Sequence, residues 1–310
     1  MHRASLSADL LLLLTAAIWG FGFVAQRLGM EHVGPFTYNG VRFGLGSLTL
    51  VPLLVGSRGR GAPPPLGQSP RRRAAGTLAL GLVLFAAASL QQVALLEAPA
   101  GKAGFITGLY VVIVPLLGVF WGLRPAPQTA LGALLAAAGL YLLSVTASFA
   151  LEPGDGLLLL SALFWSVQVL LVAWLAPRSR PAELACAQFS LCSVLSLAVA
   201  AACEPLEAAA LLAAAGPILY GGVLSVGVAY TLQVVAQQRA HPAHASILMS
   251  LEAVFAALGG FVILDERLSS RALAGCALML AGMILSQPVS YTHLRAHETP
   301  EHLVCRLLLE

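Results

Sequence analysis

The sequence contains little charge for its length. Only 10% of its 310 residues are Asp, Glu, Lys or Arg, whereas 58% are hydrophobic, and the mean hydropathy is +0.86. A soluble globular domain has about 25% charged residues, so this chain has too few to cover a surface that faces water. The composition excludes an ordinary soluble protein and predicts an integral membrane protein, with the lipid bilayer as its main partner.

The sequence also lacks the short motifs of common enzymes and pumps. It contains no HExxH zinc motif, no nucleophile elbow and no Walker sequence, which are patterns that supply a metal site, a nucleophile or a phosphate-binding loop. The near miss HETPEH at 297–302 has the wrong spacing, and the five cysteines show no metal-ligand spacing. We expect no enzyme, no catalytic residues, no cofactor, no metal site and no nucleic-acid partner.

Long apolar segments are what the sequence has instead. A helix needs about 20 residues to cross the bilayer core, and ten segments of this kind leave little chain outside them. We interpret the first as a retained helix and not as a signal peptide, because nine more follow it. The predicted fold is an all-α integral membrane protein with ten transmembrane helices. In chain order the segments cover about 8–26, 36–56, 74–96, 103–122, 128–147, 156–175, 183–203, 214–236, 243–264 and 270–287.

The distribution of basic residues predicts the orientation. With the N-terminus in the cytoplasm, ten arginines fall in loops on the inside and four basic residues fall on the outside. The run Arg71-Arg72-Arg73 supplies much of this difference. Because cytoplasmic loops carry the excess of Lys and Arg, we expect both termini to be cytoplasmic and the protein to be a multi-pass component of the cell (inner or plasma) membrane.

The two halves of the chain match each other. Shifting the chain by 142 residues lays 90–144 over 232–286 without a gap and aligns Gln91 with Gln233. A shift of 146 aligns Trp19 with Trp165. Each half has five segments, so the second half enters the membrane from the opposite side. We predict an inverted repeat of 8–147 and 156–287, a design in which transporters bind substrate near the midplane and expose it to each side in turn.

Three stretches resemble a known family. They are SLEAVFAALGGFVILDERLSSRALAGCALMLAGMIL at 250–285, its counterpart at 101–144 and the opening AAIWGFGFVAQRLGMEHVGPFTYNGVRFGLGSL at 16–48. They are similar to EamA-type domains of the drug/metabolite transporter superfamily. Glu266 matches the acidic turn of that family, and Pro115 matches its proline, but Leu123-Arg124 replaces the acidic turn in the first repeat. The resemblance implies a permease of ten helices, with both termini cytoplasmic, for small metabolites.

Glu252 is the strongest candidate for a functional residue. It lies about ten residues into its segment, roughly 15 Å deep at 1.5 Å per residue. An ionisable group at that depth is costly and faces a cavity or a partner, and a low dielectric disfavours its charged form. We hypothesise that Glu252 binds an amino group or couples transport to protons. The alternative is a carboxyl bonded to a neighbouring helix. The repeat places Tyr110 at the equivalent depth, where it either faces Glu252 or simply packs.

The other pathway candidates are polar or aromatic groups inside apolar segments. Glutamines there either line a pathway or join helices, and tryptophans outside the interfacial belts either line a cavity or pack. Arg42 either binds an anion or extends to the headgroups. His241 and His244 have no third metal ligand nearby and are interpreted as a turn at the membrane surface. The expected substrate-pathway residues are Glu252, Tyr110, Gln91, Gln233, Trp19, Trp165, Arg42 and Tyr230.

The composition changes after Gln287. Residues 288–310 hold three of the seven histidines, and we interpret them as a non-native tail, with a genuine cytoplasmic tail as the alternative. The predicted function is a secondary transporter of small organic metabolites, such as an exporter of amino acids. The alternatives are a membrane-embedded enzyme and a structural or regulatory membrane protein. The small-molecule substrate is the expected partner, and whether the protein also forms a homodimer is left open.

Overall fold

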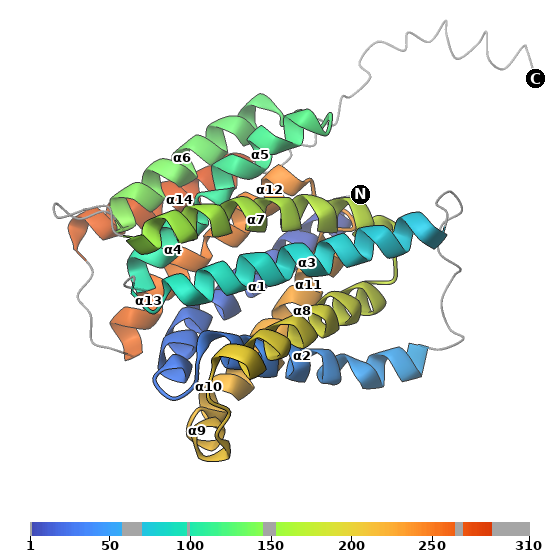
Figure 1. Ribbon diagram of the computed structural model, residues 1–310. Helices are drawn as coiled ribbons and strands as arrows, with labels where there is room; N and C mark the ends of the chain where they lie inside the picture. Colours follow the sequence, from blue (N-terminus) through green and yellow to red (C-terminus); the bar gives the residue numbers. More distant parts are fainter. Residues whose placement is uncertain (1, 58–69, 98–99, 145–152, 264–268, 287–310) are drawn as a thin grey trace, which may run out of the picture.

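The computed structural model describes residues 2–57, 70–97, 100–144, 153–263 and 269–286. All regular structure in these residues is helical, which confirms the predicted all-α class for them (Figure 1). Glu266 and the segment 288–310 lie outside the described residues. In chain order the helices are α1 (His2–Met30), α2 (Pro35–Ser57), α3 (Pro70–Ala94), α4 (Ala100–Gly108), α5 (Tyr110–Phe120), α6 (Pro127–Ser144), α7 (Pro153–Leu175), η1 (Ala176–Arg178), α8 (Pro181–Cys203), α9 (Ala208–Ala213), α10 (Ala215–Leu219), η2 (Tyr220–Tyr230), α11 (Thr231–Ala236), α12 (Pro242–Ser250), α13 (Glu252–Ile263) and α14 (Ser270–Ser286).

The described helices make this a multi-pass membrane protein. Seven of them, some running through several labelled elements, are long and apolar enough to cross a membrane, and three shorter apolar helices accompany them. Many large apolar side chains point outward, as Leu48, Phe120 and Val262 do, which suits a surface that faces lipid. Six helices begin at a proline, where its fixed φ favours a helix and its missing N–H costs no bond.

Two spans are interrupted at equivalent positions. α4 gives way to α5 at Leu109, and α12 gives way to α13 at Leu251, which is 142 residues later. The two leucines have nearly the same backbone angles, φ −60° and ψ −11° at Leu109 and φ −62° and ψ −9° at Leu251. Pro115 lies in α5 only, so a proline is not the common cause. The interruptions make Tyr110 and Glu252 the first residues of their half-helices.

Counterpart helices of the two repeats pack together closely and in opposite directions. A Cβ on Gly132 of α6 would lie 2.6 Å from the carbonyl oxygen of Gly282 in α14, and one on Gly139 would lie 2.5 Å from that of Gly275. As the number rises along α6, it falls along α14. Glycine allows this approach because two backbones meet without a side chain between them.

We expect Gly139→Ala to destabilise the protein by about 1–3 kcal/mol, because the new methyl group meets backbone that has no free rotamer to adopt. Thermal unfolding of the purified protein in detergent measures the effect. Gly156→Ala in α7 is the control, since a Cβ there meets nothing within 4 Å. Equal unfolding temperatures for the two variants would contradict the close packing of α6 on α14.

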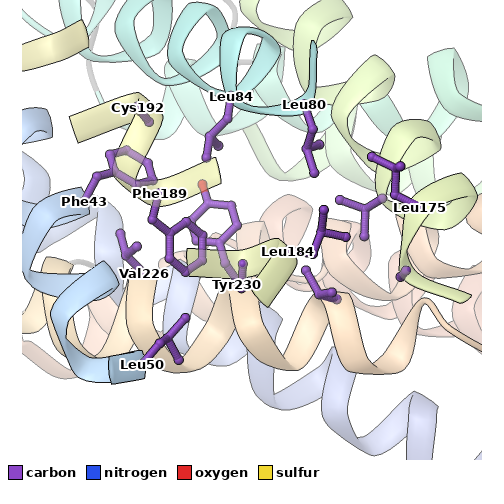
Figure 2. Close-up of a cluster of buried hydrophobic side chains, with 14 of the residues drawn as sticks. Phe43, Leu50, Leu80, Leu84, Leu175, Leu184, Phe189, Cys192, Val226 and Tyr230 are labelled. Carbon is purple, nitrogen blue, oxygen red and sulfur yellow. The ribbon is translucent and has the colours of Figure 1, made fainter. Parts of the chain in front are cut away.

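A large apolar cluster forms where α2, α3, α7 and α8 meet η2 and α11. Figure 2 shows Phe43, Phe189 and Tyr230 close together in this cluster, with Leu84 beside them. The ring centroids of Phe43 and Phe189 are 6.2 Å apart, and that of Tyr230 lies 6.1 Å from Phe43 and 5.8 Å from Phe189. Aromatic pairs in this range add to the free energy of burial. The cluster therefore holds Tyr230 in a fixed position.

A carboxylate from the second half caps a helix of the first half. Glu204, directly after α8, accepts hydrogen bonds from the backbone N–H groups of Phe36 and Thr37 at 2.8 and 2.7 Å. These donors belong to the first turn of α2, which has no partners within the helix, and the helix dipole favours a negative charge there. Sequence reasoning missed this contact because the cap is 167 residues away.

Glu204→Ala should lower the free energy of unfolding by about 1 kcal/mol, because it leaves two N–H groups at the start of α2 without their acceptor. Chemical or thermal unfolding in detergent tests this. Glu207→Ala provides the matched control in the same connection, where Glu207 is exposed and makes no side-chain capping bond. A loss of similar size in both variants would show that the cap contributes nothing specific.

Candidate functional site

A cavity lies inside the bundle between the two repeats. Its volume is about 40 Å³, which is room for about three water molecules. Both repeats contribute to its wall, including the two half-helices that follow the interruptions. The lining residues are Trp19, Phe23, Gln26, Arg42, Gln91, Thr107, Tyr110, Trp165, Gln168, Val169, Ser225, Tyr230, Gln233, Met249 and Glu252.

All eight residues predicted from the sequence for the substrate pathway line this one cavity. Sequence reasoning did not name Phe23, Gln26, Thr107 or Ser225 as candidates. The structure therefore brings together residues that are as far apart in the chain as Trp19 and Glu252.

Glu252 and Tyr110 face each other across the cavity. The Tyr110 hydroxyl donates to Glu252 Oε1 at 3.2 Å, and the two side chains are only 5% and 6% exposed. No Lys, Arg or His among the described residues lies within 4 Å of the Glu252 carboxylate. A buried carboxylate with one neutral donor lacks the counter-charge that compensates its lost hydration.

Two pairs of glutamines repeat one arrangement in both halves. Gln91 Nε2 donates to Gln26 Oε1 at 3.3 Å. In the second half, Gln168 and Gln233 donate to each other at 3.3 and 3.1 Å. Gln26 and Gln168 are 142 residues apart, as are Gln91 and Gln233. Extending the shift of 142 to the first helix would have found Gln26 from the sequence.

This pairing corrects the alignment of the two tryptophans. With the shift of 142, the counterpart of Trp165 is Phe23 and not Trp19, so the shift of 146 does not describe the first helix. The two indoles also make different bonds. Trp165 Nε1 donates to Gln91 Oε1 at 2.8 Å, whereas Trp19 Nε1 donates to the backbone carbonyl of Ser225 at 3.2 Å.

Arg42 is buried and does not reach the headgroups. Its side chain is 3% exposed and lines the cavity, which excludes the extension toward lipid that the sequence left open. Its Nε donates to Asn39 Oδ1 at 2.9 Å, and Asn39 in turn donates to the carbonyl of Ala88 at 3.1 Å. The guanidinium lies 5.3 Å from the ring centroid of Tyr38 and 5.0 Å from that of Phe43, within range of cation–π attraction.

The second-half wall of the cavity includes a π-helix, η2. Longer π-helices are rare and are often found at functional sites. η2 carries Ser225 and ends at Tyr230, whose ring lies 4.5 Å from Trp19 and 6.0 Å from Trp165 by centroid. A side chain of α1 bonds to it as well, because the Thr15 hydroxyl donates to the carbonyl of Ala229 at 3.1 Å. η2 therefore holds an aromatic ring between the two indoles.

His244 is not in a turn at the membrane surface, contrary to the interpretation of its sequence. It is 5% exposed and bonds to Asp9 and Ser286 at an end of the bundle. His241 does precede α12, and its Nδ1 accepts from the backbone N–H of Ala243 at 3.3 Å. Burial, followed by the neighbouring His244, lowers the pKa of His241, which favours the neutral form that this capping bond requires.

The fold and the cavity define a class of protein: a polytopic membrane protein with a polar chamber enclosed by two matching halves. The family model for the EamA-like transporter family matches residues 6–145 and again 152–286. The chain therefore belongs to the EamA-like transporter family, which confirms the resemblance inferred from its motifs and is consistent with the drug/metabolite transporter superfamily.

Two further proteins are similar to this chain. A protein of Archaeoglobus fulgidus, named as an uncharacterized transporter, is 29% identical over 285 residues, which cover 90% of this chain and 85% of that protein. A protein of known crystal structure is 21% identical and superposes with a TM-score of 0.73, covering 98% of this chain and 99% of that one. The second likeness shows the fold alone.

The lone carboxylate leads to a prediction about stability. We expect Glu252→Gln to raise the unfolding temperature by a few degrees, because it removes a charge without a counter-charge while Tyr110 can still donate to the amide oxygen. Thermal unfolding of the purified variant measures the change. Glu183→Gln, which removes an exposed partner of Arg180, should leave the temperature nearly unchanged. A lower unfolding temperature for Glu252→Gln would mean that a favourable charge interaction had been removed.

Proposed function

We propose that this protein is a secondary transporter of small zwitterionic metabolites, with amino acids as the principal class and export as its direction. The observation that carries the proposal is that one buried cation and one buried anion, Arg42 and Glu252, line the same cavity. An amino acid carries the complementary pair of charges on two groups a few bonds apart.

The two charges suit a ligand better than each other. Among the described residues, no ion pair within 4 Å joins Arg42 to Glu252 or to any other acidic group. Each charge lost hydration when the chain folded, and neither recovered it from a neighbour of opposite sign. We propose that the guanidinium binds the substrate carboxylate in a two-pronged contact and that Glu252 binds the substrate amino group.

The remaining wall suits the side chain of an amino acid. Trp19, Phe23, Trp165 and Tyr230 offer apolar rings, and the two glutamine pairs offer donors and acceptors at matched positions. A volume of about 40 Å³ is smaller than most metabolites, so the cavity has to widen when a substrate enters. Widening on one side at a time is the motion that alternating access requires.

The repeat supports such a motion. We propose ten spans in two inverted repeats, 8–147 and 156–287, in the cell membrane with both termini cytoplasmic. The opposed directions of α6 and α14 and the matched interruptions at Leu109 and Leu251 support the inversion. His244 bonds both to Asp9, near the start of α1, and to Ser286, at the end of α14, which supports an even number of crossings.

Counterflow in proteoliposomes tests the proposal. Vesicles that contain the purified full chain are loaded with the twenty unlabelled amino acids, and entry of each labelled amino acid is followed. We expect exchange of at least one amino acid by the wild type and at least a tenfold loss in Arg42→Gln and in Glu252→Gln, since a bond to a charged group contributes about 1.5–3 kcal/mol. Arg271→Gln, at an exposed arginine stacked on Tyr141, is the matched control and should retain exchange.

Competition and recovery of the label sharpen the result. An amine or a carboxylic acid with the same side chain, each missing one charged group, should compete at least tenfold more weakly than the amino acid. Labelled amino acid recovered chemically unchanged would separate transport from enzymatic turnover. The proposal fails if the wild type exchanges no amino acid, or if both cavity variants exchange as well as Arg271→Gln.

A further inference from the structure

A second polar cluster lies apart from the cavity, where three helices meet at one end of the bundle. His244, the third residue of α12, is bonded on both sides of its ring. Its Nε2 is 3.0 Å from Asp9 Oδ1 of α1, and its Nδ1 is 2.9 Å from Ser286 Oγ of α14. The three residues are 5%, 7% and 1% exposed. None of them lines the cavity described above.

The hydrogen bonds determine how many protons the cluster holds. The Ser286 hydroxyl donates to the carbonyl oxygen of Met283 at 2.8 Å, so its only hydrogen is used. The bond to His244 therefore has Nδ1–H as its donor. On the other side, a proton must lie between Nε2 and the Asp9 carboxylate, because two lone pairs at 3.0 Å would repel each other. Asp9 and His244 together hold one proton more than an ionised carboxylate beside a neutral imidazole.

The surroundings leave the proton to this pair. Ala8, Leu12 and Leu248 pack around it. On its own helix, His241 is used as a neutral cap. Tyr110 of α5 and Glu252 of α13 bond to each other, and Arg239, in the turn before α12, is exposed. The last two turns of α14 and all of α11 contain no acidic or basic residue, and the titratable side chains of α6 and α7 are Tyr141, Asp155 and Trp174-stacked Arg178.

We propose that Asp9 and His244 form a proton-binding site that clamps this end of the transporter shut. The bound proton makes the bond that holds α1 of the first repeat to α12 of the second. When the proton leaves, the carboxylate and the imidazole present lone pairs to each other, and the two helices separate. α1 carries Trp19 and Gln26 into the cavity and α12 leads into Glu252, so their separation widens the cavity toward this end.

The role of the clamp as a gate rests on the proposed transport function, but the proton site does not. Substitutions distinguish the two. In Asp9→Asn, an amide N–H can donate to the neutral imidazole, which makes the bond without a bound proton. In His244→Gln, an amide N–H can donate to the ionised Asp9 with the same result. In Ser286→Ala, the Asp9–His244 bond keeps its proton, so this variant is the matched control.

Hydrogen–deuterium exchange of the purified full chain tests the clamp without any substrate. Protection of the amides in 242–251 is followed from pH 5.5 to 8.5 and corrected for the pH dependence of intrinsic exchange, with α8 as the internal reference. We expect protection to fall about tenfold as the pH rises in the wild type and in Ser286→Ala, the size of one lost charge-assisted bond. Asp9→Asn and His244→Gln should stay protected throughout.

A wild type without a pH step in 242–251, or an Asp9→Asn variant with the wild-type step, would overturn the proton site. If both amide variants fail to fold, the wild-type profile against α8 still decides. Counterflow of amino acids reports on the other proposal. A chain that shows the pH step but exchanges no amino acid retains the clamp and loses the proposed function, and a chain that exchanges amino acids without the step does the reverse.

Discussion

Water is absent from the core of a bilayer, so every polar group placed there must find its partner inside the protein. This constraint accounts for the position of nearly every polar side chain described above. The glutamines bond in pairs, the indole of Trp165 bonds to one of them, and Asn39 links Arg42 to α3. The two charges of the cavity stand out because the constraint is only half met there. A group that the fold leaves partly unpartnered is where a ligand gains the most.

The repeat explains how such a cavity is built from apolar helices. One pattern, a glutamine on one helix bonded to a glutamine 65 residues away, occurs in each half. The interruptions at Leu109 and Leu251 turn one long helix of each repeat into two shorter ones. They place Tyr110 and Glu252 at equivalent positions with different chemistry, one a phenol and the other an acid. Duplication thus supplied the frame, and divergence at a few positions supplied the polarity.

Much of this was readable from the sequence, because lipid imposes a simple grammar. Sparse charge and long apolar segments predict a helical membrane protein, and depth within a segment identified Glu252 and, through the shift of 142, Tyr110. The sequence does not show which way a buried side chain points. Arg42 was equally consistent with the headgroups, and His244 with a surface turn, until their partners Asn39 and Asp9 were located. Contacts between distant segments, such as Glu204 on α2 and Gln26 on Gln91, depend on how the helices pack, and no local pattern encodes that.

The π-helix η2 makes the two halves unequal. Its counterpart in the first half lies within the regular helix α3, so the wall on one side of the cavity has a wider turn than the wall on the other. Two perfectly matched repeats would give conformations of equal free energy, each the image of the other. With one wall built differently, the two conformations differ in energy, and the empty protein rests mainly in one of them. A single stretch of widened backbone thereby decides which face of the membrane the chamber meets first.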